Sequence, residues 1–299
     1  MAYELNDMSR RAALGKIAAV AAAGAASMLP VAEASDGPAA SAKASGRLKQ
    51  SLSRWTSQAP LPELCRRLKS AGFDGIDLVY PDECSVVHES GLQVSMGYAS
   101  RREGFISVGF NDPANHAMLW KELEAAIPLA NKAGVKNLIA MFGDRKPGID
   151  ERQALDNCVA GLSKIAPFAA EHDVTICVEL LNSKVDHPGY QGDHTAFGAA
   201  VMKGVGSPNV KLVYDIYHMQ IMEGDVIRTI RDNMQWIAHF HTAGVPGRHE
   251  IDGTQELNYR AIATAIADLD FDGFLAHEFV PKHSDPFDSF AKALEICRV

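Results

Sequence analysis

The chain has 299 residues, of which 47% are hydrophobic and 22% are charged, and its formal net charge at pH 7 is −8. A surplus of acidic side chains repels a phosphate backbone, so the composition argues against a nucleic-acid partner. The five cysteines are odd in number and form no C-x-x-C pair, which argues against a disulfide framework.

The first 34 residues have the pattern of a twin-arginine export signal. Ser9-Arg10-Arg11 precedes the alanine-rich run from Ile17 to Ala26, and Ala32-Glu33-Ala34 suits a cleavage site. A transmembrane anchor is the alternative, although Gly24 and Pro30 interrupt the apolar stretch. We therefore expect export to the periplasm by the twin-arginine machinery, with the signal either cleaved or kept as an anchor.

The rest of the chain reads as a linker followed by one domain. Residues 35–46 are rich in alanine, serine, glycine and proline, which is typical of a flexible linker. From residue 47 to residue 299, short apolar strand patterns alternate with helical patterns. The predicted strands are 47–54, 73–79, 92–97, 136–142, 174–180, 211–216, 236–241 and 273–279, and the predicted helices are 62–71, 114–133, 151–172, 194–205, 224–234, 258–269 and 286–297.

Eight strands with helical crossovers predict a single-domain α/β fold, the closed (β/α)8 TIM barrel. An open doubly wound sheet is the alternative, but it would carry a glycine-rich phosphate loop, and no G-x-G-x-x-G or P-loop occurs. The helix expected within 81–91 is the weakest element because it is short. Three residues are expected to cap the first turn of a helix: Asp150, Asp225 and Asn258. Gly72 and Gly134 come just after helical patterns, where a residue able to adopt a positive φ is favoured.

Four polar side chains stand at the ends of four successive predicted strands. In the run from Val174 to Glu179, alternate residues face the barrel axis, which places Glu179 at the carboxyl end. The same alternation places Asp215, His241 and Glu278 at the ends of the next three strands. Because barrel enzymes hold their active sites at this end, we expect the four side chains to converge.

Three carboxylates and one imidazole in a small space predict a metal site. The carboxylates would repel one another, and a divalent cation relieves that repulsion. Oxygen-rich ligation with one nitrogen suits Mn²⁺ or Mg²⁺, with Zn²⁺ or Co²⁺ as alternatives. Each residue alone has a plainer explanation, such as a solvated strand end or a core histidine. The prediction therefore depends on their joint occurrence at matching depth.

Several longer motifs surround these four positions. They are Glu179-Leu180-Leu181-Asn182, Asp186-His187-Pro188-Gly189-Tyr190, Tyr214-Asp215-Ile216-Tyr217-His218-Met219-Gln220-Ile221, Ala243-Gly244-Val245-Pro246-Gly247-Arg248, Gln255-Glu256-Leu257-Asn258-Tyr259 and Glu278-Phe279-Val280-Pro281. With these motifs the chain resembles the hydroxypyruvate isomerase family of the xylose-isomerase-like barrels, a group that also holds the ketose 3-epimerases and endonuclease IV. The resemblance is strong over 174–282 and weak before it.

The resemblance implies an intramolecular oxidoreductase that converts hydroxypyruvate to tartronate semialdehyde (2-hydroxy-3-oxopropanoate). Glu179 and Glu278 would pass a proton between neighbouring carbons through an enediolate, while Asp215 and His241 complete the metal shell. A metal beside an enediolate acts as a Lewis acid, and each carbon needs a carboxylate within reach, so the chemistry agrees with these roles.

Three further side chains are expected to bind the substrate: His218, Arg248 and Asn182. The planar guanidinium of Arg248 can pair with a substrate carboxylate, although a structural salt bridge is an equal alternative. His218 could instead orient a metal ligand, and Asn182 could instead form a turn. Residues 187–190 are a candidate lid, with a simple turn as the alternative.

Two departures from the family leave the substrate open. Hydroxypyruvate isomerases usually have glutamine where His241 stands, and histidine there is typical of the 3-epimerases. The third strand, 92–97, lacks a histidine often seen in relatives. The export signal also favours a role on sugars or sugar acids outside central metabolism.

The alternatives to a hydroxypyruvate isomerase are therefore three. A sugar (ketose) epimerase or isomerase would use the same machinery. An endonuclease IV-like phosphodiesterase would need more metal ligands and a basic face, against the charge of −8. A non-catalytic sugar-binding module would not need both glutamates.

The expected ligand is thus a small hydroxy-carbonyl acid or a sugar. Barrels of this kind often pair, so a homodimer is a further expectation without an interface assigned.

Overall fold

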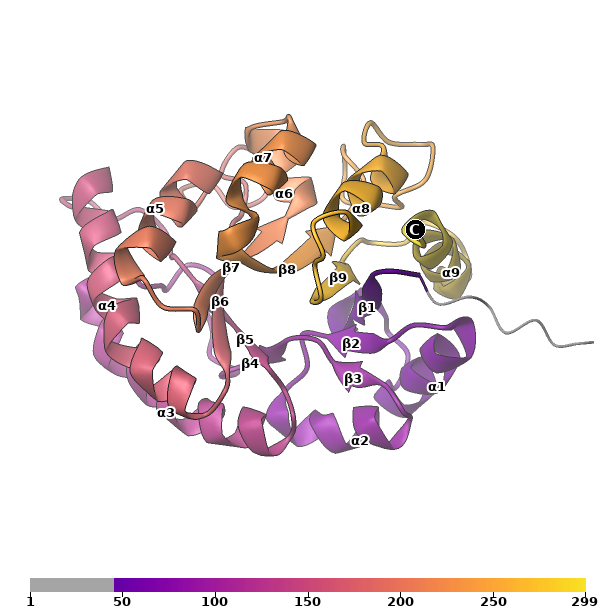
Figure 1. Cartoon of the computed structure of the whole chain (residues 1–299), viewed down its shortest axis with the longest axis horizontal. Coiled ribbons are helices and arrows are strands. Elements are labelled where there is room, and N and C mark those ends of the chain that lie inside the picture. Colours follow the sequence, from indigo (N-terminus) through magenta and orange to yellow (C-terminus); the bar gives the residue numbers. More distant parts are fainter. Residues whose placement is uncertain (1–45) are drawn as a thin grey trace, which may run out of the picture. The chain divides into compact units, whose positions relative to one another are not determined.

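The structure is a computed structural model that describes residues 46–299. In this part of the chain, parallel strands form the centre and helices surround them (Figure 1). The predicted signal at 1–34 and residues 35–45 of the predicted linker lie outside the described residues. The strands are β1 Lys49–Ser53, β2 Gly75–Asp77, β3 Gln93–Val94, β4 Gly97–Tyr98, β5 Asn137–Met141, β6 Thr175–Glu179, β7 Val210–Asp215, β8 Ile237–Thr242 and β9 Phe274–His277. The α-helices are α1 Leu61–Ala71, α2 Cys84–Glu89, α3 His116–Lys132, α4 Glu151–Glu171, α5 Thr195–Val205, α6 Ile216–Met222, α7 Val226–Asn233, α8 Tyr259–Ala267 and α9 Pro286–Ile296.

The sheet is a nearly closed barrel. Its strands are parallel and follow the order β3-β2-β1-β9-β8-β7-β6-β5-β4. The two ends of this order, β3 and β4, follow each other directly in the chain. A parallel bridge there joins Val79, two residues after β2, to Gly97 at the start of β4. The last helix, α9, packs beside β1, where the Gln50 side chain donates to the Leu294 carbonyl (Figure 1). The (β/α)8 prediction is confirmed.

The third barrel strand differs from its prediction because it is divided. The sequence predicts one strand at 92–97, whereas β3 pairs with β2 and β4 pairs with β5. The second strand, predicted at 73–79, stops at Asp77 because Leu78 has a left-handed φ of 56°. An extended ladder cannot continue through that conformation, so the pairing changes partner at this point.

Helix ends follow the predicted signals at most positions. The Asp150 carboxylate accepts from the backbone N–H of Gln153, and Gly72 has a φ of 98° after α1. Asn258 caps α8 through the backbone N–H of Ala261. Asp225 is the exception: it precedes α7 with a φ of 46° and makes no capping bond, because its carboxylate pairs with Arg228 instead.

Two short helices lie where the sequence signal is weak. The segment 81–91 contains the six-residue α2, preceded by a 3-10 turn at Pro81–Glu83. Helix α6 is absent from the sequence prediction; it follows β7 without a loop, and Asp215 is its N-cap, accepting from the backbone N–H of His218 at 3.1 Å. The strand-end carboxylate therefore also fixes the start of the next helix.

The barrel interior is polar at its centre. Ser53 donates to one carboxylate oxygen of Asp77, and Ser95 donates to the other at 2.8 Å. His239 and His241 are fully buried beside the same carboxylate. Fully buried apolar side chains from strands and helices, such as Leu52, Leu64, Ile76, Ile127, Leu162 and Ile176, form the surrounding core.

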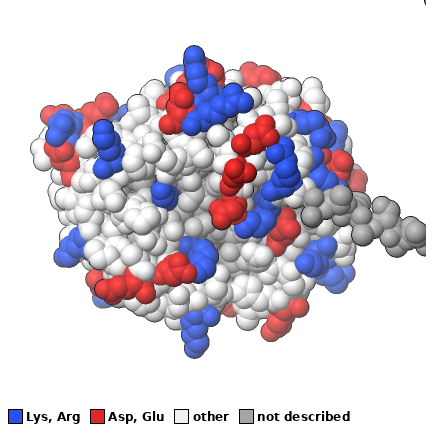
Figure 2. Space-filling model, in the orientation of Figure 1, with Lys and Arg blue, Asp and Glu red and all other residues white. Residues whose placement is uncertain are grey.

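Charges on the outer surface are mixed. Figure 2 shows acidic and basic side chains interspersed over one face of the part that is described. Among residues 46–299, no helix combines the length and apolar character needed to cross a membrane.

Candidate active site

The four predicted strand-end side chains lie together. Glu179 ends β6, Asp215 ends β7, His241 lies in β8 and Glu278 follows β9. Each can offer a ligand atom, and these atoms all lie within 4.8 Å of one another. All four residues are at most 5% exposed. Because parallel strands present their carboxyl ends at one rim of the barrel, residues far apart in sequence meet here.

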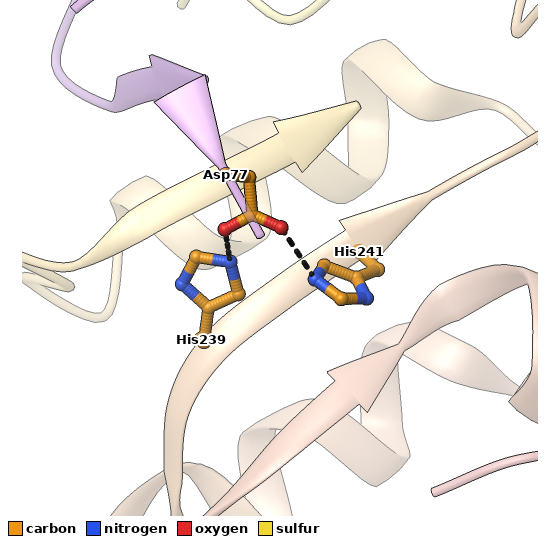
Figure 3. Close-up of side chains that lie close together, drawn as sticks. All are labelled: Asp77, His239 and His241. Atoms are coloured by element: carbon orange, nitrogen blue, oxygen red, sulfur yellow. Dashed lines mark hydrogen bonds and ion pairs between the residues drawn. The ribbon is translucent and has the colours of Figure 1, made fainter. Parts of the chain in front are cut away.

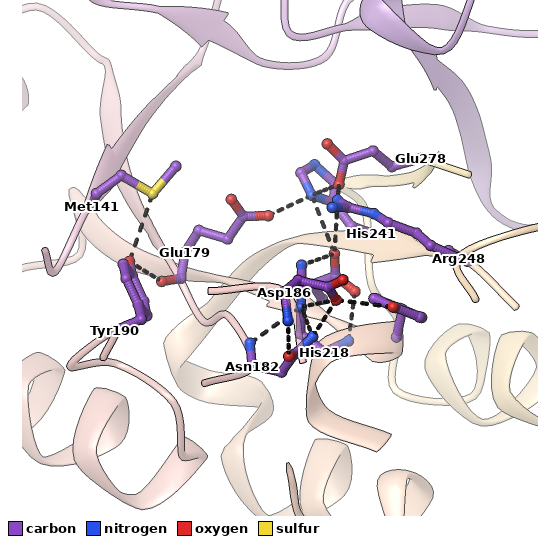
Figure 4. A network of polar contacts seen from close by, with 12 residues as sticks. Met141, Glu179, Asn182, Asp186, Tyr190, His218, His241, Arg248 and Glu278 are labelled. Carbon is purple, nitrogen blue, oxygen red and sulfur yellow. Dashed lines mark hydrogen bonds and ion pairs between the residues drawn. The ribbon is translucent and has the colours of Figure 1, made fainter. Parts of the chain in front are cut away.

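His241 is the centre of this cluster. Its Nδ1 lies 2.7 Å from Glu179 Oε1, 3.0 Å from Glu278 Oε2 and 4.0 Å from Asp215 Oδ2. Figure 4 shows the side chains of Glu179 and Glu278 approaching His241 from different sides. The arrangement of one nitrogen among three carboxylates matches the donor set of a divalent cation site.

The electrostatics of the cluster show why a cation would fit. Burial raises the pKa of Glu179, and burial together with the Glu278 charge raises the pKa of Asp215 to about 7 despite the opposing effect of Arg248. Burial would also raise the pKa of Glu278, but the charges of His241 and Arg248 outweigh it and lower that pKa to about 2. The positive charge around Glu179 and Asp215 is thus too small to keep both carboxylates ionised easily, and a divalent ion would supply the missing charge.

Asp77 contacts the cluster, although the sequence reasoning did not single it out. Its Oδ2 lies 3.1 Å from His241 Nε2, and its Oδ1 lies 2.9 Å from His239 Nε2 (Figure 3). Burial alone would lower the pKa of His241, but the charges of Glu278 and Glu179 and the hydrogen bond to Asp77 raise it well above its usual range. A cation would displace the proton from Nδ1, and the Nε2 proton donated to Asp77 would then leave Nδ1 as the ligand atom. The signal was available, because Asp77 stands near the end of a predicted strand as Glu179 does.

A cavity of about 250 Å³ opens beside the cluster. Glu179, Glu278 and Arg248 line it, so three of the predicted site residues face a space that can hold a small molecule. Trp55 lines it too and donates its indole N–H to Glu278 Oε1 at 2.7 Å. The sequence reasoning also missed Trp55, and its position directly after the first strand is the only local signal for it.

Arg248 reaches the cluster from the loop after β8. One of its terminal nitrogens, Nη2, lies 2.9 Å from Glu278 Oε2 and 3.9 Å from Asp215 Oδ2. The guanidinium carbon lies over the rings of Trp55 and Tyr217, at 5.3 and 5.6 Å from their centroids. The Arg248 side chain is 20% exposed. Its positive guanidinium therefore lies between the carboxylates and the cavity.

The structure does not bring His218 and Asn182 to the cavity, although the sequence predicts that both contact substrate. Both are fully buried and neither lines it. His218 Nδ1 accepts from the backbone N–H of Asn182 at 3.1 Å, so its other nitrogen, 3.6 Å from Asp215 Oδ2, carries the proton. The His218 side chain thus lies beside Asp215 and outside the cavity lining. Both roles expected of it from the sequence, contact with substrate and orientation of a metal ligand, stay predictions.

Asn182 forms a turn. Its side-chain oxygen accepts from the backbone N–H groups of Val185 and Asp186, and its amide donates to the Asp186 carboxylate at 2.6 Å (Figure 4). An asparagine after a strand often closes such a turn, because its side chain mimics a backbone acceptor. The turn expected of Asn182 as an alternative is present, and its substrate contact stays a prediction.

The candidate lid at 187–190 has one residue in the cavity wall and one in the core. His187 lines the cavity. Tyr190 is fully buried, and its hydroxyl accepts from the backbone N–H of Phe142 and donates to the Glu179 carbonyl, both at 2.9 Å. The segment is thus tied to the backbone of Glu179 at its far end.

Known proteins share this architecture and parts of this sequence. A family model described as a xylose isomerase-like TIM barrel matches residues 65–298. The chain is 32% identical over 170 residues to the 2-oxo-tetronate isomerase of Cupriavidus necator, covering 57% of this chain and 65% of that protein. It is also 32% identical over 158 residues to the hydroxypyruvate isomerase of Escherichia coli K12, covering 53% of this chain and 60% of that protein.

A solved structure has the same fold at lower identity. The 3-keto-D-glucoside 4-epimerase from E. coli superposes with a TM-score of 0.69, at 20% identity, over 84% of this chain and 99% of that chain. At this level of identity the likeness concerns the arrangement of strands and helices.

Proposed function

The chain belongs to the xylose isomerase-like TIM barrel family and is an isomerase, and we propose that it converts hydroxypyruvate to 2-hydroxy-3-oxopropanoate with the help of a divalent cation. The C. necator and E. coli relatives are named for isomerisation of small oxo acids. A three-carbon hydroxy-oxo acid suits a cavity of about 250 Å³.

One observation carries the proposal: Glu179, Asp215, His241 and Glu278 meet with ligand atoms within 4.8 Å of one another, beside a cavity. A solvated strand end or an isolated core histidine would not bring three carboxylates into one buried group. Burial of several carboxylates is costly unless an opposite charge compensates for it. The cluster therefore supports a cation site used for chemistry.

The proposed roles follow from the positions of the side chains. A cation bound to the cluster, Mn²⁺ or Mg²⁺ by its oxygen-rich donors, would act as a Lewis acid toward the substrate oxygens. Glu179 and Glu278 both line the cavity, so one can take a proton from carbon 3 of hydroxypyruvate. The other can return a proton to carbon 2, while a hydroxyl proton moves between the two oxygens, so that no atom is gained or lost.

Arg248 is proposed to hold the substrate carboxylate. It lines the cavity and is already 2.9 Å from a carboxylate oxygen of Glu278. A guanidinium can pair with a second carboxylate through its remaining N–H donors. This would place the negative end of the substrate next to Glu278 and its carbonyl next to the cluster.

Deuterium incorporation tests this function. The protein is treated with a chelator, supplied with Mn²⁺ and incubated with hydroxypyruvate in D₂O. We expect deuterium on carbon of both substrate and product, with activity lost after chelation and regained with Mn²⁺. Isomerisation at full rate in metal-free protein would contradict the proposed metal dependence, and isomerisation without deuterium uptake would contradict solvent-exchanging proton transfer by the glutamates.

A ketose epimerase or isomerase is the second candidate, and His241 is the observation that favours it. Histidine at this ligand position is typical of the 3-epimerases, which the sequence resembles at this residue. A panel of ketoses in the same D₂O assay separates the two candidates. Faster exchange with a ketose than with hydroxypyruvate would assign the site to a sugar.

We also propose that residues 1–34 direct export through the twin-arginine route to the periplasm. The support is the Arg10-Arg11 pair before the alanine-rich run. Cell fractionation of the protein with both arginines changed to lysine tests this. Retention of the variant in the cytoplasm is expected, and unchanged export would contradict the assignment.

A further inference from the structure

Trp55 reaches the cluster from the first strand of the barrel. It lies in the 3-10 turn Arg54–Thr56 that follows β1, and the Thr56 hydroxyl donates to the Ser53 carbonyl at 2.8 Å across this turn. β1 pairs with β9, which Glu278 follows, so barrel closure brings Trp55 and Glu278 together although 223 positions separate them. The Trp55 side chain lines the cavity and is 40% exposed, so it borders both the cavity and the solvent.

Both carboxylate oxygens of Glu278 have a partner. Oε1 accepts from the Trp55 indole N–H at 2.7 Å. Oε2 lies 3.0 Å from His241 Nδ1 and 2.9 Å from Arg248 Nη2 (Figure 4). The last torsion of a glutamate side chain has a broad, roughly two-fold preference, so the residue itself does not distinguish its two oxygens. An indole N–H only donates, and it therefore keeps Oε2 turned toward the cluster without taking up the proton that the carboxylate is to carry.

The ring of the same indole lies against Arg248. The guanidinium carbon is 5.3 Å from the centroid of Trp55 and 5.6 Å from that of Tyr217 on α6. The buried Nε of Arg248 has no hydrogen-bond partner among the described residues. A guanidinium is attracted to the face of an aromatic ring, most strongly to that of tryptophan. The two rings thus support a group that hydrogen bonds hold only at its far end.

We propose that Trp55 is a positioning residue with two separable functions: its N–H fixes the carboxylate of Glu278 for proton transfer, and its ring fixes the guanidinium of Arg248 for substrate binding. The inference rests on the proposed function, in which Glu278 moves a proton and Arg248 holds the substrate carboxylate. A carboxylate that turns loses the geometry that proton transfer needs, which slows the chemical step. A guanidinium that loses its aromatic neighbour binds substrate less tightly and leaves the chemical step unchanged.

Two substitutions of Trp55 separate these functions. Trp55→Phe keeps an aromatic ring and removes the N–H. Trp55→Gln removes the ring and keeps an N–H donor, since the amide nitrogen lies as many bonds from Cα as the indole nitrogen does. With Mn²⁺ and hydroxypyruvate, Trp55→Phe should lower kcat by about 10- to 100-fold and change KM by less than about 3-fold. Trp55→Gln should keep kcat well above that of Trp55→Phe and raise KM by about 3- to 10-fold.

Trp120→Phe is the matched control. The Trp120 indole donates to the Gly161 carbonyl at 2.8 Å, and Lys164 Nζ lies 3.6 Å from its ring centroid. The control therefore loses the same N–H from a ring that also faces a cation, but away from the cavity. Circular dichroism and melting temperature show that each variant is folded. Mn²⁺ affinity, measured by titration calorimetry, should match that of wild type in all variants, because the oxygen that Trp55 holds is not the one that faces His241.

The outcomes separate this inference from the proposed function. In a wild-type protein that isomerises hydroxypyruvate, equal kcat in Trp55→Phe and Trp120→Phe, or equal losses in Trp55→Phe and Trp55→Gln, overturns the function of the N–H. A wild-type KM in Trp55→Gln overturns the function of the ring. A loss of Mn²⁺ affinity in Trp55→Phe as large as its loss of kcat would place the effect on the cation and overturn the positioning of Glu278. A wild-type protein without turnover contradicts the proposed function and the inference together.

Discussion

His241 joins two polar groups that lie far apart in the sequence. Its Nδ1 faces Glu179 and Glu278, and its Nε2 faces Asp77, which is 164 residues earlier in the chain. Because a neutral imidazole carries one proton, the carboxylate that accepts this proton decides which nitrogen is free for a cation. Asp77 therefore acts on the cluster through His241 without lining the cavity.

Changing Asp77 to Asn tests this orienting role. The amide keeps the size of the side chain, but it can present an N–H to His241 where a carboxylate presents only acceptors. We expect Mn²⁺ affinity, measured by titration calorimetry, to fall by about 10- to 100-fold. Asp74→Asn is the control, because Asp74 accepts from the backbone N–H of Gln50 and has no contact with His241. Equal Mn²⁺ affinity in the two variants would show that Asp77 does not orient His241.

Changing Glu278 to Gln tests the acid–base pair. The substitution keeps the shape of the side chain and removes its ability to carry a proton, so we expect kcat to fall by about 10²- to 10⁴-fold. The unfolding transition should stay cooperative. Glu256→Gln provides the comparison, because this carboxylate bonds Gln220 at the surface. A kcat for the Glu278→Gln variant equal to that of the comparison would remove Glu278 from proton transfer.

The sequence predicts the positions of residues better than their contacts. Alternation along a strand places Glu179, Asp215, His241 and Glu278 at one rim, and the structure brings them together. The alternation carries no information on the segment that comes after a strand. Because α6 begins directly after Asp215, His218 is turned toward Asp215 and away from the cavity.

At the scale of elements, the alternation of strand and helix patterns is sufficient to predict the barrel. All eight expected strands are present, although the third is divided into β3 and β4. The division depends on the left-handed backbone at Leu78, a residue type that rarely adopts it. No sequence pattern indicates such a change of partner, because the surrounding contacts impose it.

Helix α4 offers a test of the capping prediction. Asp150 accepts from the backbone N–H of Gln153 at 2.8 Å, and this N–H would otherwise lack a partner within the helix. Asp150→Ala should lower the free energy of unfolding by about 1 kcal/mol, measured by urea denaturation. Asp150→Ser should keep most of the stabilisation that the cap provides, since a serine side chain also caps helices. No difference between the two variants would mean that the cap contributes nothing.

At the scale of the whole molecule, barrel closure buries ionisable side chains, and His277 is one of them. His277 is fully buried between Thr242 and Gln50, at 2.9 and 3.0 Å, and burial lowers its pKa to about 3. In the unfolded chain its pKa returns to about 6.5. The unfolded state therefore binds the proton first, and folding stability is lost as the pH falls from about 6.5 toward about 3.

This predicts a pH dependence that a variant should reduce. Between pH 6 and pH 4, His277 should contribute a slope of up to about 1.4 kcal/mol per pH unit to the free energy of unfolding. His277→Gln should flatten the profile over this window, whereas the exposed His283→Gln should not. The free energy of unfolding is measured by denaturation at several pH values. The same pH dependence in wild type and both variants would show that His277 does not cause the loss of stability at low pH.

The meeting of four side chains from successive strands around one divalent ion is the claim on which the other assignments depend. A crystal of the protein grown with Mn²⁺, with diffraction recorded at the manganese absorption edge, tests it most directly. We predict one anomalous peak at about 2.0–2.4 Å from one atom each of Glu179, Asp215, His241 Nδ1 and Glu278. A cluster without a peak, or a peak held by Asp77 and His239 instead, would contradict the account.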